Sequence, residues 1–167
     1  MAWRRLAARA ILLDVAGNLL LQKGHDPYDL DRGSWYELPG GGIEPGEPSH
    51  EAVVRELWEE VGIGGVEVGP VVWIDRVQFS IGGWAIDQDN HYHLCRVSTL
   101  MPDIEPQGLE QLEVLYMQGA RWLSLDELMA DPLQSYPPRL RELAPALLAG
   151  DLPTAPIVLQ GDPAPIG

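Results

Sequence analysis

Three glutamates on one predicted helix are the residues whose type and spacing point most directly to chemistry. At about 100° per residue, Glu56, Glu59 and Glu60 fall on one side of a helix over residues 49–61, opposite an apolar side. Carboxylates at this spacing repel one another, whereas hard divalent cations such as Mg²⁺ bind oxygen ligands of this kind. Arg55, one turn before Glu59, can pair with a carboxylate and orient it. These residues indicate a divalent-cation site.

Three consecutive glycines lie upstream of this helix. Gly40, Gly41 and Gly42 permit close backbone approach, so that a main-chain carbonyl or amide can face a metal or a phosphate. Glu44 and Glu47 add two carboxylates just before the helix. Acidic helix faces are usually only solvated, and on these residues alone that alternative stays open.

The segment Gly41–Ile63 resembles the Nudix box, G-x5-E-x7-R-E-U-x-E-E-x-G-U, in which U is a bulky aliphatic residue. Every defined position carries the required type: Gly41, Glu47, Arg55, Glu56, Leu57, Glu59, Glu60, Gly62 and Ile63. Seven fixed residue types at ordinary frequencies coincide at a given site with odds on the order of 10⁻⁸. The flanks WYELPGG (35–41) and ARWLSLDEL (120–128) are also similar to the family. The chain thus resembles the MutT/Nudix hydrolases, with no subgroup identified.

This resemblance implies a Mg²⁺- or Mn²⁺-dependent pyrophosphohydrolase. Its substrate would be a nucleoside diphosphate linked to another moiety, of the nucleoside triphosphate or nucleotide-sugar type, cleaved by water attack on phosphorus. The implied metal ligands are Glu56, Glu60, Glu59 and the carbonyl of Gly40. Arg55 would orient a glutamate, and Glu47 would support the loop or a further metal. Glu56, Glu59 and Arg55 are accordingly expected among the catalytic residues.

The general base is expected either in the box or in the later loop over residues 102–119. That loop offers Glu105, Glu110 and Glu113. We favour Glu113, then Glu110, because related sequences place an extra glutamate at a similar position. An ordinary solvated carboxylate is the alternative.

Substrate contacts are predicted from the backbone of Gly41 and Gly42, from Arg9 near the first strand, and from Trp35 as a stacking surface. Tyr36, Phe79, Trp84 and Tyr92 are further stacking candidates, although aromatic residues of a sheet protein more often belong to its core. Arg4 and Arg5 are weighed equally between phosphate contact and solvation. His91 and His93 are expected to be hydrogen-bonded surface residues rather than metal ligands. Markers of the ADP-ribose and dinucleoside polyphosphate subgroups are missing after the box, where Gln78, Phe79, Ser80 and Ile81 stand.

Two alternative functions use the same fold. A nucleotide sensor that binds without cleaving usually loses a box glutamate or the arginine, and here all are present. A diphosphate isomerase needs a cysteine and glutamate pair, whereas Cys95 is the single thiol and no signature surrounds it. Both alternatives are weaker than the hydrolase.

The elements that must position these residues are read from apolar periodicity and turn residues. We expect a hairpin over residues 5–23, a short strand at 35–38, the helix 49–61 capped by Ser49 and ended by Gly62, a hairpin of strands 71–79 and 84–97 turning near Gly82-Gly83, a short strand at 122–123, a helix opened by Ser124, and a last helix around 138–149. This order predicts an α+β protein. The resemblance implies the Nudix fold, a mixed sheet between helices in an α/β/α sandwich.

Composition limits the partners and the number of domains. The chain has 167 residues, with 25 acidic and 11 basic side chains and a net charge of −14, so long nucleic acids and anionic membranes are not expected. A small nucleotide is expected instead, with a homodimer left open. One domain over residues 1–150 and an extended or mobile tail over 151–167, which holds four prolines, are predicted. One cysteine and no long apolar run favour a cytoplasmic location.

Overall fold

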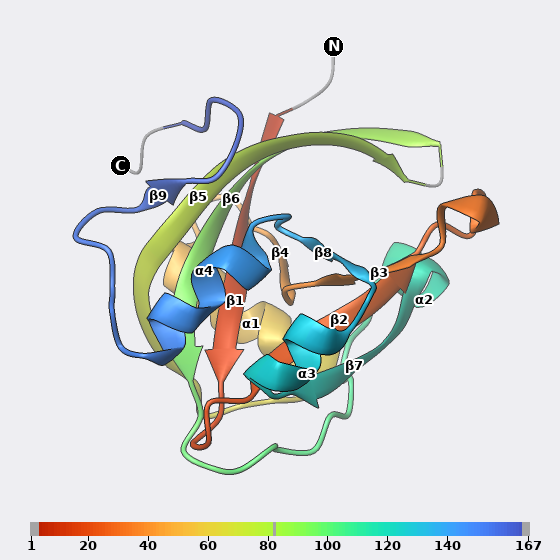
Figure 1. Cartoon of the computed structure of the whole chain (residues 1–167). Helices are drawn as coiled ribbons and strands as arrows, with labels where there is room; N and C mark the ends of the chain where they lie inside the picture. The colour runs from red at the N-terminus through yellow and green to blue at the C-terminus, as the bar shows by residue number, and fades with distance from the viewer. Residues whose placement is uncertain (1–3, 82, 165–167) are drawn as a thin grey trace.

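A curled mixed β-sheet with helices on both faces forms the centre of the molecule (Figure 1). The computed structural model describes residues 4–81 and 83–164; residues 1–3, Gly82 of the expected turn and the tail end at 165–167 lie outside these. Within the described residues the sheet has nine strands, in the order β8-β3-β2-β1-β6-β5-β9, with β4 paired to β1 and β7 paired to β2. The predicted α+β fold and its α/β/α layering are confirmed.

Nine strands and five helical segments make up the described part of the chain. The strands are β1 (Arg4–Leu13), β2 (Leu19–His25), β3 (Ser34–Glu37), β4 (Gly40–Gly42), β5 (Glu67–Ile81), β6 (Trp84–Arg96), β7 (Met117–Leu123), β8 (Gln134–Tyr136) and β9 (Ile157–Val158). The helices are η1 (Leu30–Arg32, a 3-10 turn), α1 (Ser49–Val61), α2 (Gln111–Tyr116), α3 (Leu125–Ala130) and α4 (Leu140–Leu148).

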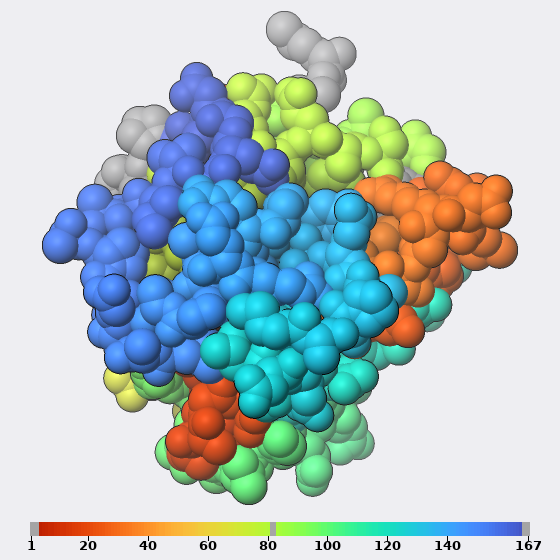
Figure 2. Space-filling model, in the orientation of Figure 1, coloured from red at the N-terminus to blue at the C-terminus, as the bar shows by residue number. Residues whose placement is uncertain are grey.

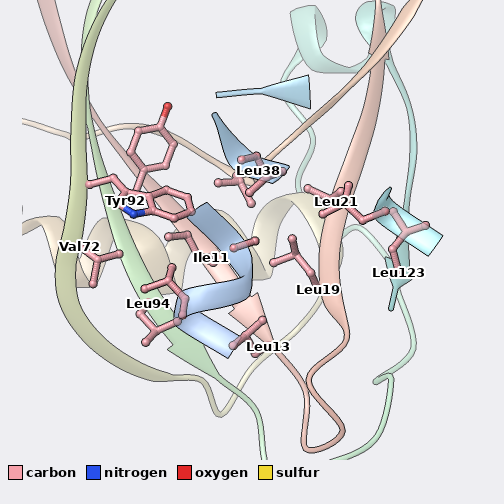
Figure 3. Close-up of a cluster of buried hydrophobic side chains, with 14 of the residues drawn as sticks. Ile11, Leu13, Leu19, Leu21, Leu38, Val72, Tyr92, Leu94 and Leu123 are labelled. Carbon is pink, nitrogen blue, oxygen red and sulfur yellow. The ribbon is translucent and has the colours of Figure 1, made fainter. Parts of the chain in front are cut away.

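Two hydrophobic cores occupy the two faces of the sheet. One lies between the sheet and α3 and α4, and Figure 3 shows Ile11 and Leu13 of β1, Leu19 of β2 and Leu94 of β6 within it. The other packs alternate residues of β1 against the apolar side of α1. Because successive residues of a strand point to opposite faces, β1 supplies both cores. Burial on both faces explains why this strand is almost continuously apolar.

The pairing of β1 differs from the predicted hairpin. β1 and β2 are antiparallel neighbours only at Leu13 and Leu19, whereas β1 runs parallel to β6 along its whole length. The glycine strand β4 pairs antiparallel with Ala7, Ala8 and Arg9 on the edge of β1 that faces away from β6. A Cβ on Gly40 would lie 2.1 Å from the carbonyl oxygen of Ala8, so glycine is what permits this pairing.

Helix α1 has the predicted bounds and the predicted end. Gly62 stops it in the left-handed conformation with φ 70°. The predicted cap is wrong: Pro48 holds the N-cap position, and the Ser49 hydroxyl instead forms a hydrogen bond with Nε2 of His93, at 2.8 Å. The first helical turn is thereby tied to β6.

Several segments are more regular than the sequence indicated. Helix α2 forms inside the stretch 102–119 that was expected to be a loop, and β7 begins at Met117 rather than at Trp122. The tail contributes β9, which pairs parallel with β5, and Figure 2 shows the chain beyond α4 lying on the surface of the molecule. The capping box of Ser124 and Glu127 opens α3 as predicted. In the part of the chain that is described, every helix is too short or too polar to cross a membrane.

Candidate active site

Three carboxylates meet beside the glycine strand. Glu56 and Glu60 stand one turn apart on the inner side of α1, where both are buried, and Glu113 reaches them from α2. One carboxylate oxygen from each residue lies within 4.8 Å of the other two. This donor set suits a hard divalent cation, which binds carboxylate oxygens and removes their mutual repulsion. The sequence-predicted Glu56, Glu60 and Glu113 are thus brought together.

Burial makes the charged state of this cluster costly. Removal from water raises the pKa of Glu56 to about 7, although Arg55 beside it opposes the rise. Burial also raises the pKa of Glu60 well above its ordinary value and, to a smaller degree, that of Glu113. The three groups therefore need a proton or a cation as a partner at neutral pH.

Arg55 organises the acidic groups around the cluster. Its Nε donates to Glu47 at 2.8 Å, its Nη1 donates to Glu56 at 2.9 Å and to Glu59 at 3.2 Å, and its Nη2 donates to the carbonyl of Gly42 at 2.9 Å. The hydrogen bonds with Glu47 contribute most to raising the pKa of Arg55, and they lower the pKa of Glu47. One guanidinium thus fixes the glycine strand, the loop before α1 and the carboxylate of Glu56.

The glycine strand touches the cluster directly. The amide of Gly40 donates to Oε2 of Glu60 at 2.8 Å, and a Cβ on Gly41 would lie 2.6 Å from a carboxylate oxygen of Glu56. The carbonyl of Gly40, predicted as a metal ligand, accepts a hydrogen bond from Nη1 of Arg9 at 3.0 Å. Backbone and carboxylates are therefore in contact, whereas the role of this backbone toward a metal or a phosphate stays a prediction.

Glu59 lies at the edge of the cluster, and its role as a third metal ligand stays a prediction. Its carboxylate is half-buried, pairs with Arg55, and stands outside the group formed by Glu56, Glu60 and Glu113. Glu56 and Glu60 are buried, whereas the side chain of Glu59 borders the outer loop (residues 97–110), where a Cβ on Gly108 would lie 3.5 Å from it. That loop packs against it, since the amides of Gln107 and Gly108 donate to the main-chain oxygen of Glu59 at 2.9 Å.

A cavity of about 390 Å³ adjoins the cluster. Helix α2 connects the two, because Glu113 joins the carboxylates while Leu112 and Tyr116 line the cavity. The predicted contact residues Arg9 and Trp35 line it as well. Trp35 is buried, and the guanidinium of Arg32 lies 4.6 Å from its ring centroid. A substrate whose phosphates lie at the carboxylates would thus extend into a pocket with aromatic and cationic walls.

Polar residues of this cavity were missed in the sequence. Glu37, Asp75, Gln88, Asn90 and Gln160 all contribute to its lining, and Asp75, Gln88 and Asn90 are buried. The available signal was the alternation of Gln88 and Asn90 on a strand face whose later positions, Tyr92 and Leu94, are apolar. Asp75 and Gln160 had no such signal, because neither lies in a recognisable motif.

The other aromatic candidates, the two histidines and the cysteine lie in the core, in the cavity wall or at the surface. Tyr36 lies in the core, where its hydroxyl donates to Asp131 at 2.8 Å, whereas Phe79 and Tyr92 line the cavity. Trp84 is 70% exposed on the β5–β6 hairpin. The surface placement expected for His91 and His93 is wrong, since both are buried on the α1 side of β6. Burial raises the pKa of Cys95 to about 12, as befits an unreactive thiol.

The remaining candidates for phosphate contact and for the general base lie at different places in the structure. Arg4 forms an ion pair with Asp89, whose oxygen lies 2.7 Å from its Nε, whereas Arg5 lines the cavity and donates to Gln88. Glu110 begins α2, and its amide donates to Glu113 at 2.7 Å. Glu105 lies on the outer loop, where its amide donates to the carbonyl of Val61.

Known proteins are similar to this chain in sequence and in fold. The family model of the NUDIX domain matches residues 3–147. An RNA pyrophosphohydrolase of Pseudomonas paraeruginosa (strain DSM 24068 / PA7) is 30% identical over 162 residues, which cover 84% of this chain and 92% of that protein. Another from Erythrobacter litoralis (strain HTCC2594) is 28% identical, covering 74% of this chain and 78% of that protein.

Solved structures agree at the level of the fold. An Ap4A hydrolase binary complex from C. elegans superposes with a TM-score of 0.61 at 20% identity, covering 87% of this chain and 98% of that one. A MutT protein from Methanosarcina mazei Go1 gives 0.57 at 21% identity, covering 87% and 96%. With the family match over most of its length, the chain belongs to the NUDIX domain family, as a hydrolase that acts on phosphoric anhydride bonds.

Proposed function

We propose that this protein is a divalent-cation-dependent pyrophosphohydrolase that cleaves a nucleoside diphosphate linked to another moiety. The observation that carries the proposal is the convergence of Glu56, Glu60 and Glu113 beside a cavity of about 390 Å³. Mg²⁺ is the proposed cation, with Mn²⁺ as a substitute, because the three groups offer only hard oxygen ligands.

Each side chain has a proposed task. Glu56 and Glu60 hold the cation, which when bound neutralises phosphate charge and acidifies water. Arg55 keeps Glu56 in place through its 2.9 Å hydrogen bond, and Glu59, which pairs with the same guanidinium at 3.2 Å, is proposed as a third ligand of the cation. Glu113 accepts the proton of the attacking water, a task that suits a carboxylate whose pKa burial has raised.

The substrate is proposed to be a small nucleotide of the triphosphate or nucleotide-sugar type. Arg9 is placed to meet its phosphates beside Gly40, with the backbone of Gly41 and Gly42 nearby, and Trp35 supplies an aromatic wall. The net charge of −14 disfavours a long polyanion.

The 5′ end of an RNA is the second candidate. It is favoured by relatives named RNA pyrophosphohydrolase, one of which matches 84% of this chain at 30% identity. A triphosphate at an RNA terminus offers the same anhydride bonds as a free nucleotide, so the cluster alone does not separate the two.

The test is a substrate panel with and without Mg²⁺. Nucleoside triphosphates, nucleotide sugars and 5′-triphosphate RNA oligomers are incubated with the protein, and released phosphate, pyrophosphate and nucleoside monophosphate are measured. We expect Mg²⁺-dependent release that is fastest from a free nucleotide. Faster release from RNA would select the second candidate, and no release from any compound would refute the proposal.

A matched pair of variants ties the activity to the cluster. Glu60→Gln removes a buried carboxylate and should lower turnover by at least about 100-fold. Glu51→Gln changes an exposed glutamate in the first turn of the same helix and should retain activity. Full activity of Glu60→Gln would show that the ligand assignment is wrong.

A further inference from the structure

We propose that Gln160, held in place by the C-terminal segment 157–162, completes the substrate site as a specificity-determining residue that hydrogen-bonds the nucleobase. This inference rests on the proposed function, whose substrate it specifies further. The segment lies beyond the residues matched by the family model, which end at 147, yet Gln160 lines the same cavity as Arg9 and Tyr116.

The main chain is held on both sides of Gln160. β9 pairs parallel with β5, and the amide of Leu159 donates to the carbonyl of Ile74 at 2.9 Å. The amide of Arg76 donates to the carbonyl of Gln160 at 3.1 Å. Gly161 then turns with φ +68°, where a Cβ would lie 2.6 Å from the main-chain oxygen of Arg76. The position of Gln160 is therefore set by backbone contacts before any ligand arrives.

Further along the tail, Arg4 of β1 makes a second contact with the segment. Nη2 of Arg4 donates to the carbonyl of Asp162 at 2.9 Å, while the same guanidinium holds Asp89 of β6. The tail is thus attached to β5 by main-chain hydrogen bonds and to β1 through Arg4. Figure 2 shows this last part of the described chain lying against the strands of the β5–β6 hairpin.

A row of hydrogen bonds crosses the cavity and ends at Gln160. Nε of Arg5 donates to Oε1 of Gln88, whose Nε2 donates to Oδ1 of Asn90. Nδ2 of Asn90 donates to Oδ1 of Asp75 at 2.8 Å, and Nε2 of Gln160 donates to Oδ2 of Asp75 at 3.3 Å. All five residues line the cavity.

The arginine end of this row fixes the orientation of the amides within it. An arginine can only donate, so Gln88 presents its oxygen to Arg5 and its nitrogen to Asn90, and Asn90 in turn presents its nitrogen to Asp75. Each amide then has a second N–H that the row does not use. Gln160 adds a second N–H and a carbonyl oxygen at the outer end.

These spare groups suit the edge of a nucleobase. A base is a flat ring with hydrogen-bond donors and acceptors on its edge, and the same cavity provides Trp35, Phe79 and Tyr92 as aromatic walls. The row runs from β1, beside the glycine strand, across β6 to β5 and the tail. At about 4.8 Å between strands, this places Gln160 several strand spacings from the carboxylates, at the end opposite to the phosphates.

The test compares Gln160→Ala with Val158→Ala, which alters an exposed side chain of the same segment. Steady-state kinetics are measured with nucleotides that differ only in their base. For Gln160→Ala we expect KM of the preferred nucleotide to rise about fivefold, as for loss of one hydrogen bond, with kcat within about twofold and with weaker discrimination among bases. Gln160→Glu places a carboxylate beside Asp75 and should raise KM further. Val158→Ala should match the wild-type protein.

A binding measurement separates this inference from the proposed function. Nucleoside monophosphates are titrated into wild-type protein and both variants by calorimetry, without turnover. Weaker binding to Gln160→Ala supports the role of Gln160 even where the wild-type protein hydrolyses nothing, which would refute only the proposed function. Wild-type KM, base preference and monophosphate affinity in Gln160→Ala would overturn the inference.

Discussion

Glu56 and Glu60 face the glycine strand so closely that side-chain size on that strand controls their position. The amide of Gly40 donates to Glu60, and Gly41 leaves room for the carboxylate of Glu56. Arg55 holds Glu56 from the other side. Each carboxylate is therefore fixed by contacts that a single added methyl group or a lost charge would disturb.

Gly41→Ala tests this packing. The added Cβ would lie 2.6 Å from a Glu56 oxygen, and the flexible end of Glu56 would move aside, so we expect a folded protein whose activity falls roughly 10- to 100-fold. Gly64→Ala, where the Cβ meets the Trp58 ring at 3.7 Å, is the matched control. Circular dichroism checks folding and phosphate release checks activity; equal activities would contradict the contact.

At the scale of elements, α1 and α2 each contribute residues both to the carboxylate cluster and to the structure around it. The inner side of α1 packs on the sheet and also carries Glu56 and Glu60. Helix α2 directs Glu113 to the cluster, while Leu112 and Tyr116 line the cavity. A shift of either helix would therefore change the site and its surroundings together.

Glu113→Gln tests the role of α2. Oε2 of Glu113 accepts the amide of Glu110 at 2.7 Å, and a glutamine can retain this helix-starting contact while losing the negative charge. We expect kcat to fall roughly 100- to 10,000-fold, as for loss of a general base, with no loss of thermal stability, because a neutral glutamine relieves the charge cluster. Glu105→Gln, on the outer loop, should leave kcat unaltered. Comparable turnover in both variants would exclude Glu113 as the base.

Gly62→Ala tests the end of α1. Gly62 has φ +70°, and a Cβ would lie 1.9 Å from the main-chain oxygen of Glu105. Backbone strain and this clash should lower the free energy of unfolding by about 3 kcal/mol. Gly65→Ala, with φ +64° and open space among the described residues, should lose only about 1 kcal/mol. Urea denaturation measures both, and equal losses would show that the loop simply moves away.

At the scale of the whole molecule, charge is concentrated where the fold buries it. Residues 44–63 contain six carboxylates and one arginine, and so contribute −5 to the net charge of −14. The fold removes Glu56 and Glu60 from water, so the metal-free protein carries an unfavourable charge cluster at neutral pH. Stability should therefore depend on both protons and divalent cations.

Glu56→Gln measures this dependence. The pKa of Glu56 is about 7 in the folded protein against an ordinary 4.5, so its stabilising contribution is complete below pH 4.5 and is lost as the pH rises through 7. In metal-free protein, the wild-type free energy of unfolding should therefore fall relative to that of the variant over this range. Adding Mg²⁺ at pH 7 should raise the wild-type Tm more than that of the variant. A pH-independent difference would refute the burial of a titrating Glu56.

Structural features that depend on neighbouring residues in the chain could be predicted from the sequence, whereas features that depend on distant segments could not. The bounds of α1, its end at Gly62 and the α3 capping box were predicted correctly, because helix periodicity and caps depend on neighbours in the chain. The pairing of β1 with β6 and the strand β9 were not predicted, because pairing partners distant in sequence leave little local signal. Buried His93 was missed for the same reason.

The amino-acid sequence by itself determined the Nudix box, the acidic side of α1 and the hydrolase class, because these depend on residue types at set spacings. Only the tertiary structure decided which carboxylates meet. The folding of residues 111–116 into α2 brings Glu113 to Glu56 and Glu60. It also decided that Gln160 reaches Asp75, because the pairing of β9 with β5 joins segments that no local pattern connects.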